Sequence, residues 1–170
     1  MELPFGNSYV VDTDVLIILM KHYPPDKPTF NAIWDEIENL IKQGNMFTTD
    51  VVYKEIGRYE GKGARLKNWA KSQKSKRRFF IGIDAETWQL AKEIRDKFPA
   101  LIKQKNIETG EEEADPFLIA LAKAKGATII TNERKDLFDR IPVIAKHYGI
   151  KSIDLFEFFA ERGLKFVKEQ

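Results

Sequence analysis

Short apolar runs, separated by segments with helical periodicity, are the feature that most constrains the fold of this chain. They lie at Val10–Val11, Met46–Thr49, Ala127–Thr131 and Ile150–Ile153. Buried strands that alternate with helices predict an α/β fold with a parallel sheet covered on both faces. The 170 residues show no convincing internal boundary, so we expect a single domain over residues 1–170.

Local signals predict how several elements begin or end. Thr13 or Asp14 is the expected cap of the helix after the first strand, because a short side-chain oxygen binds the free N–H groups of a first turn. Residues 79–83 are apolar and few, so an edge strand and a packed loop both remain open. Residues 99–110 are polar and irregular, which predicts a mobile flap. The acids at 111–113 are expected to form a solvated run.

Composition excludes several kinds of site. The chain has no cysteine, which excludes disulfides, thiolate nucleophiles and cysteine–zinc sites and is compatible with a reducing compartment. Its two histidines, His22 and His147, lie far apart, so any metal would be held by oxygen, which favours Mg²⁺ or Mn²⁺. No apolar run approaches the roughly 20 residues that span a bilayer, and the N-terminus has no secretory signal. We therefore expect a cytoplasmic protein without a membrane partner.

A basic segment, residues 61–83, gives the chain an uneven distribution of charge. It has eight Lys or Arg residues and no acid, whereas the rest of the chain has 20 basic and 26 acidic residues. Such a segment is typical of a protein with a polyanionic partner. Trp69 and Phe79 or Phe80 are candidate stacking surfaces for unpaired bases, although Trp69 is more typical of a core position. We expect the phosphate backbone of such a partner to contact the last four cations of the segment: Lys74, Lys76, Arg77 and Arg78.

Acids recur where strands give way to helices and where helices begin. Asp12 follows the first strand, and Asp115 precedes Pro116, which suits an N-cap and a first helical position. Each acid has an ordinary alternative role as a cap or a solvated side chain. However, the carboxyl ends of neighbouring parallel strands meet at one edge of a sheet, where ligands bind. The acids that can converge there are Asp12, Glu55, Asp115 and Glu133 or Asp136.

A cluster of carboxylates is unstable alone, because like charges a few ångströms apart raise one another's pKa. A divalent cation removes that cost, and carboxylate oxygens without His or Cys suit Mg²⁺ or Mn²⁺. Such a site can deprotonate a water for in-line attack on a phosphodiester and stabilise the leaving oxygen. The acidic cluster and the basic segment together predict a nuclease.

Four stretches resemble the motifs of one known family. V-V-D-T-D-V-L-I resembles the first motif of PIN domains, which are metal-dependent nucleases, and Y-K-E-I resembles their second acidic motif. A-D-P-F-L-I-A-L-A resembles the third and I-I-T-N-E-R-K-D-L the fourth, with the same order and coarse spacing. Y-P-P, F-N-A-I-W and I-K-Q-G-N-M-F-T-T-D-V-V-Y-K-E-I further resemble a PIN-like branch catalogued mainly as a domain of unknown function.

The resemblance implies a three-layer α/β/α sandwich with a central, mostly parallel sheet and an acidic Mg²⁺/Mn²⁺ site. The acids implied as catalytic residues and metal ligands are Asp12, Glu55 and Asp115, with Glu133 or Asp136 as the fourth. We also place three polar residues at the substrate-binding surface: Asp14, Thr131 and Asn132. Asp14 stands where Asn is common in the family, and Glu133 where Asp or Asn is usual.

Many small bacterial and archaeal members of the wider family are VapC-like toxins that cleave RNA and are silenced by a bound antitoxin. For this chain, the resemblance therefore implies an endoribonuclease, plausible as the toxin of a type II toxin–antitoxin pair. It also implies an antitoxin partner and a homodimer.

Two alternatives remain open from the sequence. D-T-D-V-L and I-I-T-N also resemble motifs of haloacid-dehalogenase-type phosphatases, in which Asp12 would attack phosphorus and Asp14 would act as acid and base. That family needs a Lys and then a pair of acids after a further strand, and D-L-F-E after Ile150–Ile153 is a poor fit. The second alternative is a non-catalytic PIN-like scaffold that binds RNA or a protein.

Overall fold

The sheet at the centre of the protein is entirely parallel. The computed structural model describes residues 7–61, 63–102 and 112–165. Its five strands have the order β3-β2-β1-β4-β5. They are β1 (Tyr9–Val11), β2 (Met46–Thr49), β3 (Phe80–Ile81), β4 (Thr128–Ile130) and β5 (Ser152–Ile153).

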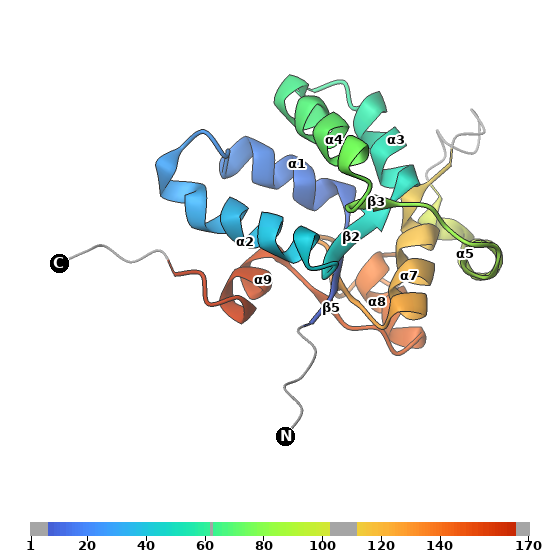
Figure 1. Ribbon diagram of the computed structural model, residues 1–170. Coiled ribbons are helices and arrows are strands. Elements are labelled where there is room, and N and C mark those ends of the chain that lie inside the picture. The colour runs from blue at the N-terminus through green and yellow to red at the C-terminus, as the bar shows by residue number, and fades with distance from the viewer. Residues whose placement is uncertain (1–6, 62, 103–111, 166–170) are drawn as a thin grey trace.

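Helices cover both faces of this sheet. Figure 1 shows α1, α2 and α9 on one side of the strands and α5, α7 and α8 on the other, with α3 and α4 above them. The helices are α1 (Thr13–His22), α2 (Asn31–Lys42), α3 (Asp50–Arg58), α4 (Ala64–Lys76), α5 (Ala85–Lys97), α7 (Ala114–Lys125), α8 (Ile141–His147) and α9 (Leu155–Glu161). The expected three-layer α/β/α fold is confirmed.

The middle strand, β1, explains where a site can form. Its residues are at most 2% exposed, and it pairs with β2 on one side and β4 on the other. From β1 the chain continues to β2 and β3 in one direction, whereas β4 and β5 extend in the other. The crossovers therefore diverge between β1 and β4, and in open α/β sheets ligands bind at the carboxyl ends of the strands beside such a point. Figure 1 shows that α1 starts directly from this end of β1.

The N-caps of two helices lie one or two residues before the predicted caps. Asp12 caps α1, since its extended backbone ends the strand and its Oδ1 accepts the Thr13 N–H at 2.7 Å. The prediction of a cap at Thr13 or Asp14 was therefore wrong. α7 begins at Ala114, so Asp115 lies inside the first turn and is not the N-cap. A proline is tolerated next to it because the first turn leaves N–H groups unbonded.

Other local predictions have mixed outcomes. The open choice at residues 79–83 resolves as the edge strand β3, which pairs only with β2 among the described residues. Of the predicted flap, Pro99–Leu101 forms a short 3₁₀ helix, and residues 103–110 lie outside the described residues. Glu113 is only 3% exposed, so it is not a solvated acid, while Glu112 pairs with Lys54 and residue 111 lies outside the described part. Among the described residues, no helix has the length and apolar character needed to cross a membrane.

Candidate functional site

Three acids meet at the carboxyl edge of the sheet. Asp12 comes from the end of β1, Asp115 from the first turn of α7, and Glu133 from the loop that follows β4. One carboxylate oxygen of each lies within 4.8 Å of those of the other two. Asp12 is buried and the other two are half-buried. The residues that the sequence predicted to converge thus include these three, hereafter the acid cluster.

Asp12 is the electrostatic centre of this cluster. Burial raises its pKa well above the ordinary value, and the negative charges of Asp14, Asp115 and Glu133 raise it further. A hydrogen bond from the Thr131 hydroxyl to Asp12 Oδ2, 2.8 Å long, acts in the opposite direction. A cation placed between these oxygens would therefore reduce the repulsion among the carboxylates and stabilise the ionised form of Asp12.

Glu133 is held by the backbone around it. Its N–H donates to the Thr131 hydroxyl at 3.2 Å, and its Oε2 accepts the Ile141 N–H at the start of α8 at 2.9 Å. The Thr131 hydroxyl thus joins β1 to the loop after β4. Asn132, which lies between them in the chain, uses its Oδ1 to accept the Leu155 N–H at the start of α9. Thr131 and Asn132, predicted to contact substrate, therefore both have structural bonds.

Glu55 approaches the cluster differently from the other acids. Its Oε2 accepts the Thr13 hydroxyl at 2.6 Å, and its Oε1 accepts the Ala114 N–H at 2.9 Å. It lies outside the group of three whose oxygens come within 4.8 Å of one another. Glu55 therefore ties α3 to the starts of α1 and α7, and through Ala114 it fixes the position of Asp115. The role of the Thr13 hydroxyl was not foreseen, because it depends on a residue 42 positions away in the chain.

Asp136 lies apart from the acid cluster. It forms a two-pronged hydrogen bond with Arg134, 3.0 and 2.6 Å, and is exposed. This cation lowers the pKa of Asp136. Between the two candidates for the fourth acid, the geometry brings Glu133 to the site and leaves Asp136 at the surface.

The phosphatase alternative finds no support in the acids after β5. Asp154 caps α9 by accepting the Glu157 N–H at 2.8 Å, and Glu157 in turn accepts the Asp154 N–H at 3.2 Å. This reciprocal arrangement is a capping box. Both acids are therefore explained by the helix that they begin.

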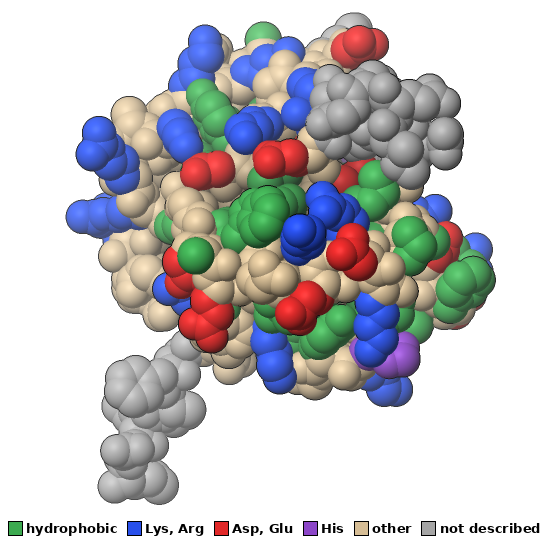
Figure 2. Space-filling model, turned by 90° about the vertical axis from the view of Figure 1, so that its right-hand side faces the viewer, with side chains coloured by type: hydrophobic (Ala, Val, Ile, Leu, Met, Phe, Trp, Pro, Cys, Tyr) green, Lys and Arg blue, Asp and Glu red, His purple; other side chains and the backbone are tan. Residues whose placement is uncertain are grey.

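The end of the basic segment reaches the same edge of the sheet. Lys74 pairs with Asp50, which directly follows β2, at 2.6 Å, and its ammonium lies 5.3 Å from the centre of the Tyr53 ring. Lys74, Asp50 and Arg77 line a hollow of about 360 Å³ beside β3. In Figure 2, Lys and Arg side chains are most numerous in the upper left of the view and also occur at its centre and lower edge. Lys76, Arg77 and Arg78 are exposed.

The aromatic residues of the basic segment are not available for stacking. Phe79 and Phe80 are at most 4% exposed, and Trp69 packs edge-on against Trp34 and Phe79 with ring centres 5.8 and 5.2 Å apart. They belong to the core, as the alternative interpretation of Trp69 predicted. The suggestion that Phe79 or Phe80 stacks on bases was wrong, because β3 faces inward.

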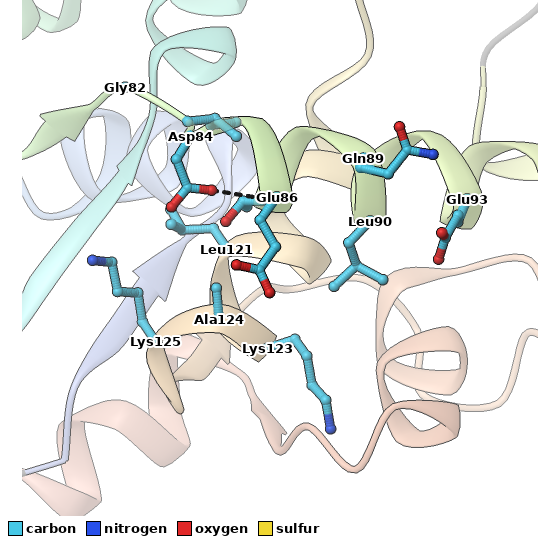
Figure 3. Close-up of a pocket in the computed structure, with 12 residues that line it drawn as sticks. Gly82, Asp84, Glu86, Gln89, Leu90, Glu93, Leu121, Lys123, Ala124 and Lys125 are labelled. Carbon is cyan, nitrogen blue, oxygen red and sulfur yellow. Dashed lines mark hydrogen bonds between the residues drawn. The ribbon is translucent and has the colours of Figure 1, made fainter.

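A second hollow lies away from the acid cluster, between α5 and the end of α7. It has a volume of about 710 Å³ and includes none of the three clustered acids. Figure 3 shows acids from α5, among them Glu86 and Glu93, opposite Lys123 and Lys125 from α7. On the face shown in Figure 2, acidic, basic and hydrophobic side chains are likewise interspersed. This mixture does not favour a metal ion or a polyanion.

The donor set of the acid cluster fits a hard divalent cation. It offers carboxylate oxygens and no sulfur or imidazole, which suits Mg²⁺ or Mn²⁺. Two ligands of one Mg²⁺ lie at most about 4.2 Å apart, so a spacing of up to 4.8 Å requires a small inward movement or a bridging water. Water-mediated ligation is usual for Mg²⁺, which keeps part of its hydration shell.

Comparisons with known proteins agree with this fold. A chain of the DNA-bound VapBC from Salmonella typhimurium matches with a TM-score of 0.52 and 19% identity, covering 87% of this chain and 98% of that one. A chain of VapBC2 from Rickettsia felis, bound to a DNA fragment from its promoter, matches with a TM-score of 0.49 and 17% identity, covering 86% and 97%. At these identities the likeness concerns the fold alone. No curated protein matches the chain.

The family assignment comes from the sequence itself. The model of the family described as a domain of unknown function, DUF4411, matches residues 9–166, which include all the acids discussed above. The expected membership of a branch catalogued as a domain of unknown function is thereby confirmed. The chain belongs to the DUF4411 family, and it has the α/β/α fold of a VapBC chain.

Proposed function

We propose that this protein is an endoribonuclease that uses Mg²⁺ or Mn²⁺ to hydrolyse phosphodiester bonds. The observation that carries the proposal is the convergence of Asp12, Asp115 and Glu133 within 4.8 Å at the carboxyl edge of the sheet. A divalent ion there supplies a water of lowered pKa and charge stabilisation for the leaving oxygen. The basic end of α4 at the same edge supports a phosphate-bearing substrate.

Each acid then has its own role. Asp12, Asp115 and Glu133 hold the metal, directly or through water. Glu55 positions Asp115, because it holds the N–H of the preceding residue at the start of α7. Asp136 takes no part, since it is bonded to Arg134 at the surface.

The test is cleavage of single-stranded RNA with Mg²⁺ or Mn²⁺, in the wild type and in Asp12→Asn and Asp115→Asn. Loss of a metal ligand should lower the rate by at least about 100-fold, since even groups that support ligands cost 10- to 100-fold. Asp136→Asn is the matched control, because it removes an acid from the same loop as Glu133 without touching the cluster. Cleavage that resists EDTA, or that survives both substitutions, contradicts the proposal. Turnover of a phosphomonoester alone favours the phosphatase, and binding without cleavage favours the scaffold.

We assign the phosphate backbone to the basic end of α4. Charge reversal of Lys74, Lys76, Arg77 and Arg78 together should weaken RNA binding chiefly at low salt, because fewer neutralised phosphates release fewer counterions. The slope of log affinity against log salt should become shallower by about 0.7 for each phosphate of a single strand that the variant no longer neutralises. An unchanged slope moves the binding surface elsewhere.

We further propose that the protein is the toxin of a type II toxin–antitoxin pair and forms a homodimer. The fold likeness to a chain of the VapBC complex of Salmonella typhimurium supports this extension. A small protein encoded beside this chain should co-purify with it and abolish RNA cleavage. Sedimentation of the chain alone measures the dimer. A monomer that no neighbouring product inhibits contradicts this extension and leaves the nuclease proposal standing.

A further inference from the structure

Two phenylalanines stand out on the described surface. Phe138 is 79% exposed and Phe156 is 71% exposed, whereas Trp88, the next most exposed large hydrophobic residue described, is 45% exposed. Single exposed apolar residues are common and need no function. Their position therefore decides whether these two have one.

Both phenylalanines lie at the carboxyl edge of the sheet. Phe138 is in the loop between β4 and α8, and Phe156 is the second residue of α9, directly after β5. The loop that carries Phe138 begins at the acid cluster and is closed by it, because Glu133 Oε2 accepts the Ile141 N–H at 2.9 Å. Phe138 therefore lies on a loop whose two ends are both fixed to an acid of the site.

Interactions on either side of Phe156 join it to the same loop. Leu155 donates its N–H to Asn132 Oδ1 at 3.0 Å, and Glu157 forms an ion pair with Lys135. Phe156 lies between these two residues in the chain. The start of α9, which carries Phe156, is thus bonded at two points to the loop that carries Phe138.

Local interactions are found beside both rings. Phe156 packs edge-on against the buried Phe159, with ring centres 6.4 Å apart and planes at 79°. Phe138 occupies a tight turn in which the Arg140 N–H donates to the Leu137 carbonyl at 3.2 Å. Each ring is therefore presented to solvent from an ordered backbone, which reduces the entropy lost when a ligand binds.

Charged residues flank Phe138 in the chain. Phe138 has Lys135, Asp136, Asp139 and Arg140 near it in the chain, and all are charged and in part exposed. Among the described residues no ring contact joins Phe138 to Phe156, so the two rings are separate apolar points. A protein partner would be expected to cover a contiguous apolar area, whereas bases of a flexible strand stack one by one on separate rings.

We propose that Phe138 and Phe156 are base-stacking positions for single-stranded RNA that extends from the acid cluster across the ends of β4 and β5. This inference rests on the proposed function, which supplies the strand. Every base has a face that can stack, so this surface should bind unpaired nucleotides with little sequence preference. A duplex, whose base faces are already stacked, should bind it poorly.

The experiment measures the affinity of a fluorescently labelled single-stranded RNA in the Asp12→Asn background, which prevents cleavage. Phe138→Ala and Phe156→Ala should each weaken binding about 5- to 150-fold. The salt dependence should stay unchanged, because neither substitution removes a cation that neutralises a phosphate. Trp88→Ala, an exposed aromatic on α5, is the matched control and should bind as the background does. Phe138→Trp should retain binding. Thermal unfolding of each variant excludes a folding defect.

An RNA of the same length with abasic positions gives a second readout. It should bind the background weakly, and the two alanine substitutions should weaken it no further. If both alanine variants bind RNA as tightly as the Asp12→Asn background does, the inference is overturned. It is also overturned if Trp88→Ala weakens binding as much as they do. A change in oligomeric state with unchanged RNA affinity assigns the rings to a protein contact and overturns it too. If the alanine variants bind RNA with unchanged affinity and still cleave it with metal, the stacking inference fails and the nuclease proposal stands. If the chain with Asp12 intact binds RNA through the two rings but does not cleave it, the nuclease proposal fails and the stacking inference stands.

Discussion

The two ends of β1 carry charge in opposite ways. At the amino end, the Tyr9 hydroxyl donates to Glu161 at 2.9 Å, and the same carboxylate pairs with Lys151 at 2.6 Å. At the carboxyl end, Asp12 is buried beside carboxylates whose charges add to the burial that raises its pKa. Pairing opposite charges stabilises a fold, whereas grouping like charges costs stability. The comparison indicates that the charges at the amino end stabilise the fold, whereas those at the carboxyl end cost stability until a cation balances them.

The paired end extends across the molecule. Arg162, next to Glu161, forms an ion pair with Glu36 of α2 at 2.7 Å, and the Tyr9 ring packs edge-on against Phe158 of α9. The end of α9 is thereby joined to β1 and α2. Nothing in this network needs a ligand to balance it, so it provides the reference against which the carboxyl end can be tested.

The largest expected effect is that of the metal on stability. Mg²⁺ or Mn²⁺ at about 100 times its dissociation constant should raise the free energy of unfolding by about 2.7 kcal/mol. Asp115→Asn should lose most of this gain, while Glu161→Gln at the other end of β1 should keep it. Urea unfolding with metal and with EDTA measures both. If the metal stabilises both variants equally, the proposed difference between the amino and carboxyl ends of β1 is wrong.

Asp12→Asn should stabilise the metal-free protein by about 1 to 2 kcal/mol at neutral pH. Because the folded pKa is raised, the unfolded chain loses its proton first as the pH rises. As the pH rises from the ordinary pKa of about 3.9 to the raised pKa of the folded state, the contribution of Asp12 to the free energy of unfolding therefore decreases. Above the raised pKa this contribution stays low. The asparagine keeps an oxygen that can cap α1 and removes this pH dependence.

Chemical unfolding in EDTA at a series of pH values measures this effect. The wild type and Asp12→Asn should approach each other in stability towards acidic pH and diverge towards neutral pH. A variant that is less stable than the wild type at neutral pH would show that Asp12 contributes to folding as the amino end does.

Glu161→Gln should destabilise the protein by about 1 kcal/mol. The carboxamide oxygen can accept a hydrogen bond from the Tyr9 hydroxyl or from the Lys151 ammonium. Its NH₂ group then faces the other of these two donors and cannot accept from it. Thermal unfolding in low salt measures the loss, and high salt should reduce the part that comes from the exposed Lys151. Lys151→Ala is the control for that part alone. No change in Glu161→Gln would remove the stabilising role assigned to the amino end.

The smallest effect is expected at Asp136. Its pair with Arg134 is exposed at the surface, with side chains 64% and 68% exposed, and such pairs contribute at most about 1 kcal/mol. Asp136→Asn should leave stability nearly unchanged and RNA cleavage intact. A loss of cleavage would bring this residue into the site and reverse the assignment of the fourth acid.

The periodicity of the sequence was enough to predict the layers and the parallel sheet. Val10–Val11 and Ala127–Thr131 are buried β-branched runs, and each precedes a helix, which is typical of strands in a parallel sheet. The sequence left open whether these two strands are neighbours, and the structure shows that β1 pairs with β4. The meeting of Asp12 with Glu133 follows from that pairing, since both residues leave strands at the same edge. These are consequences of short-range pattern and topology.

Other features depend on interactions that no local pattern contains. The choice between Glu133 and Asp136 is decided by the Ile141 N–H and by Arg134, each of which satisfies one of the two carboxylates. Glu113 looks like part of a solvated run, yet the packing around the start of α7 leaves it 3% exposed. The edge strand β3 is only two residues long, too short for a period of two to be recognised.

The hydrogen bond from the Ile141 N–H to Glu133 fixes the two ends of the loop at residues 134–140. Because a side chain closes the loop on itself, its interior can differ in length or character while residue 133 and the first turn of α8 stay where they are. Variants with other sequences between Glu133 and Ile141 should change the surface beside the acid cluster and leave the positions of its acids unchanged. Under the proposed function, the loop could thus change its contacts with RNA while Glu133 keeps its position.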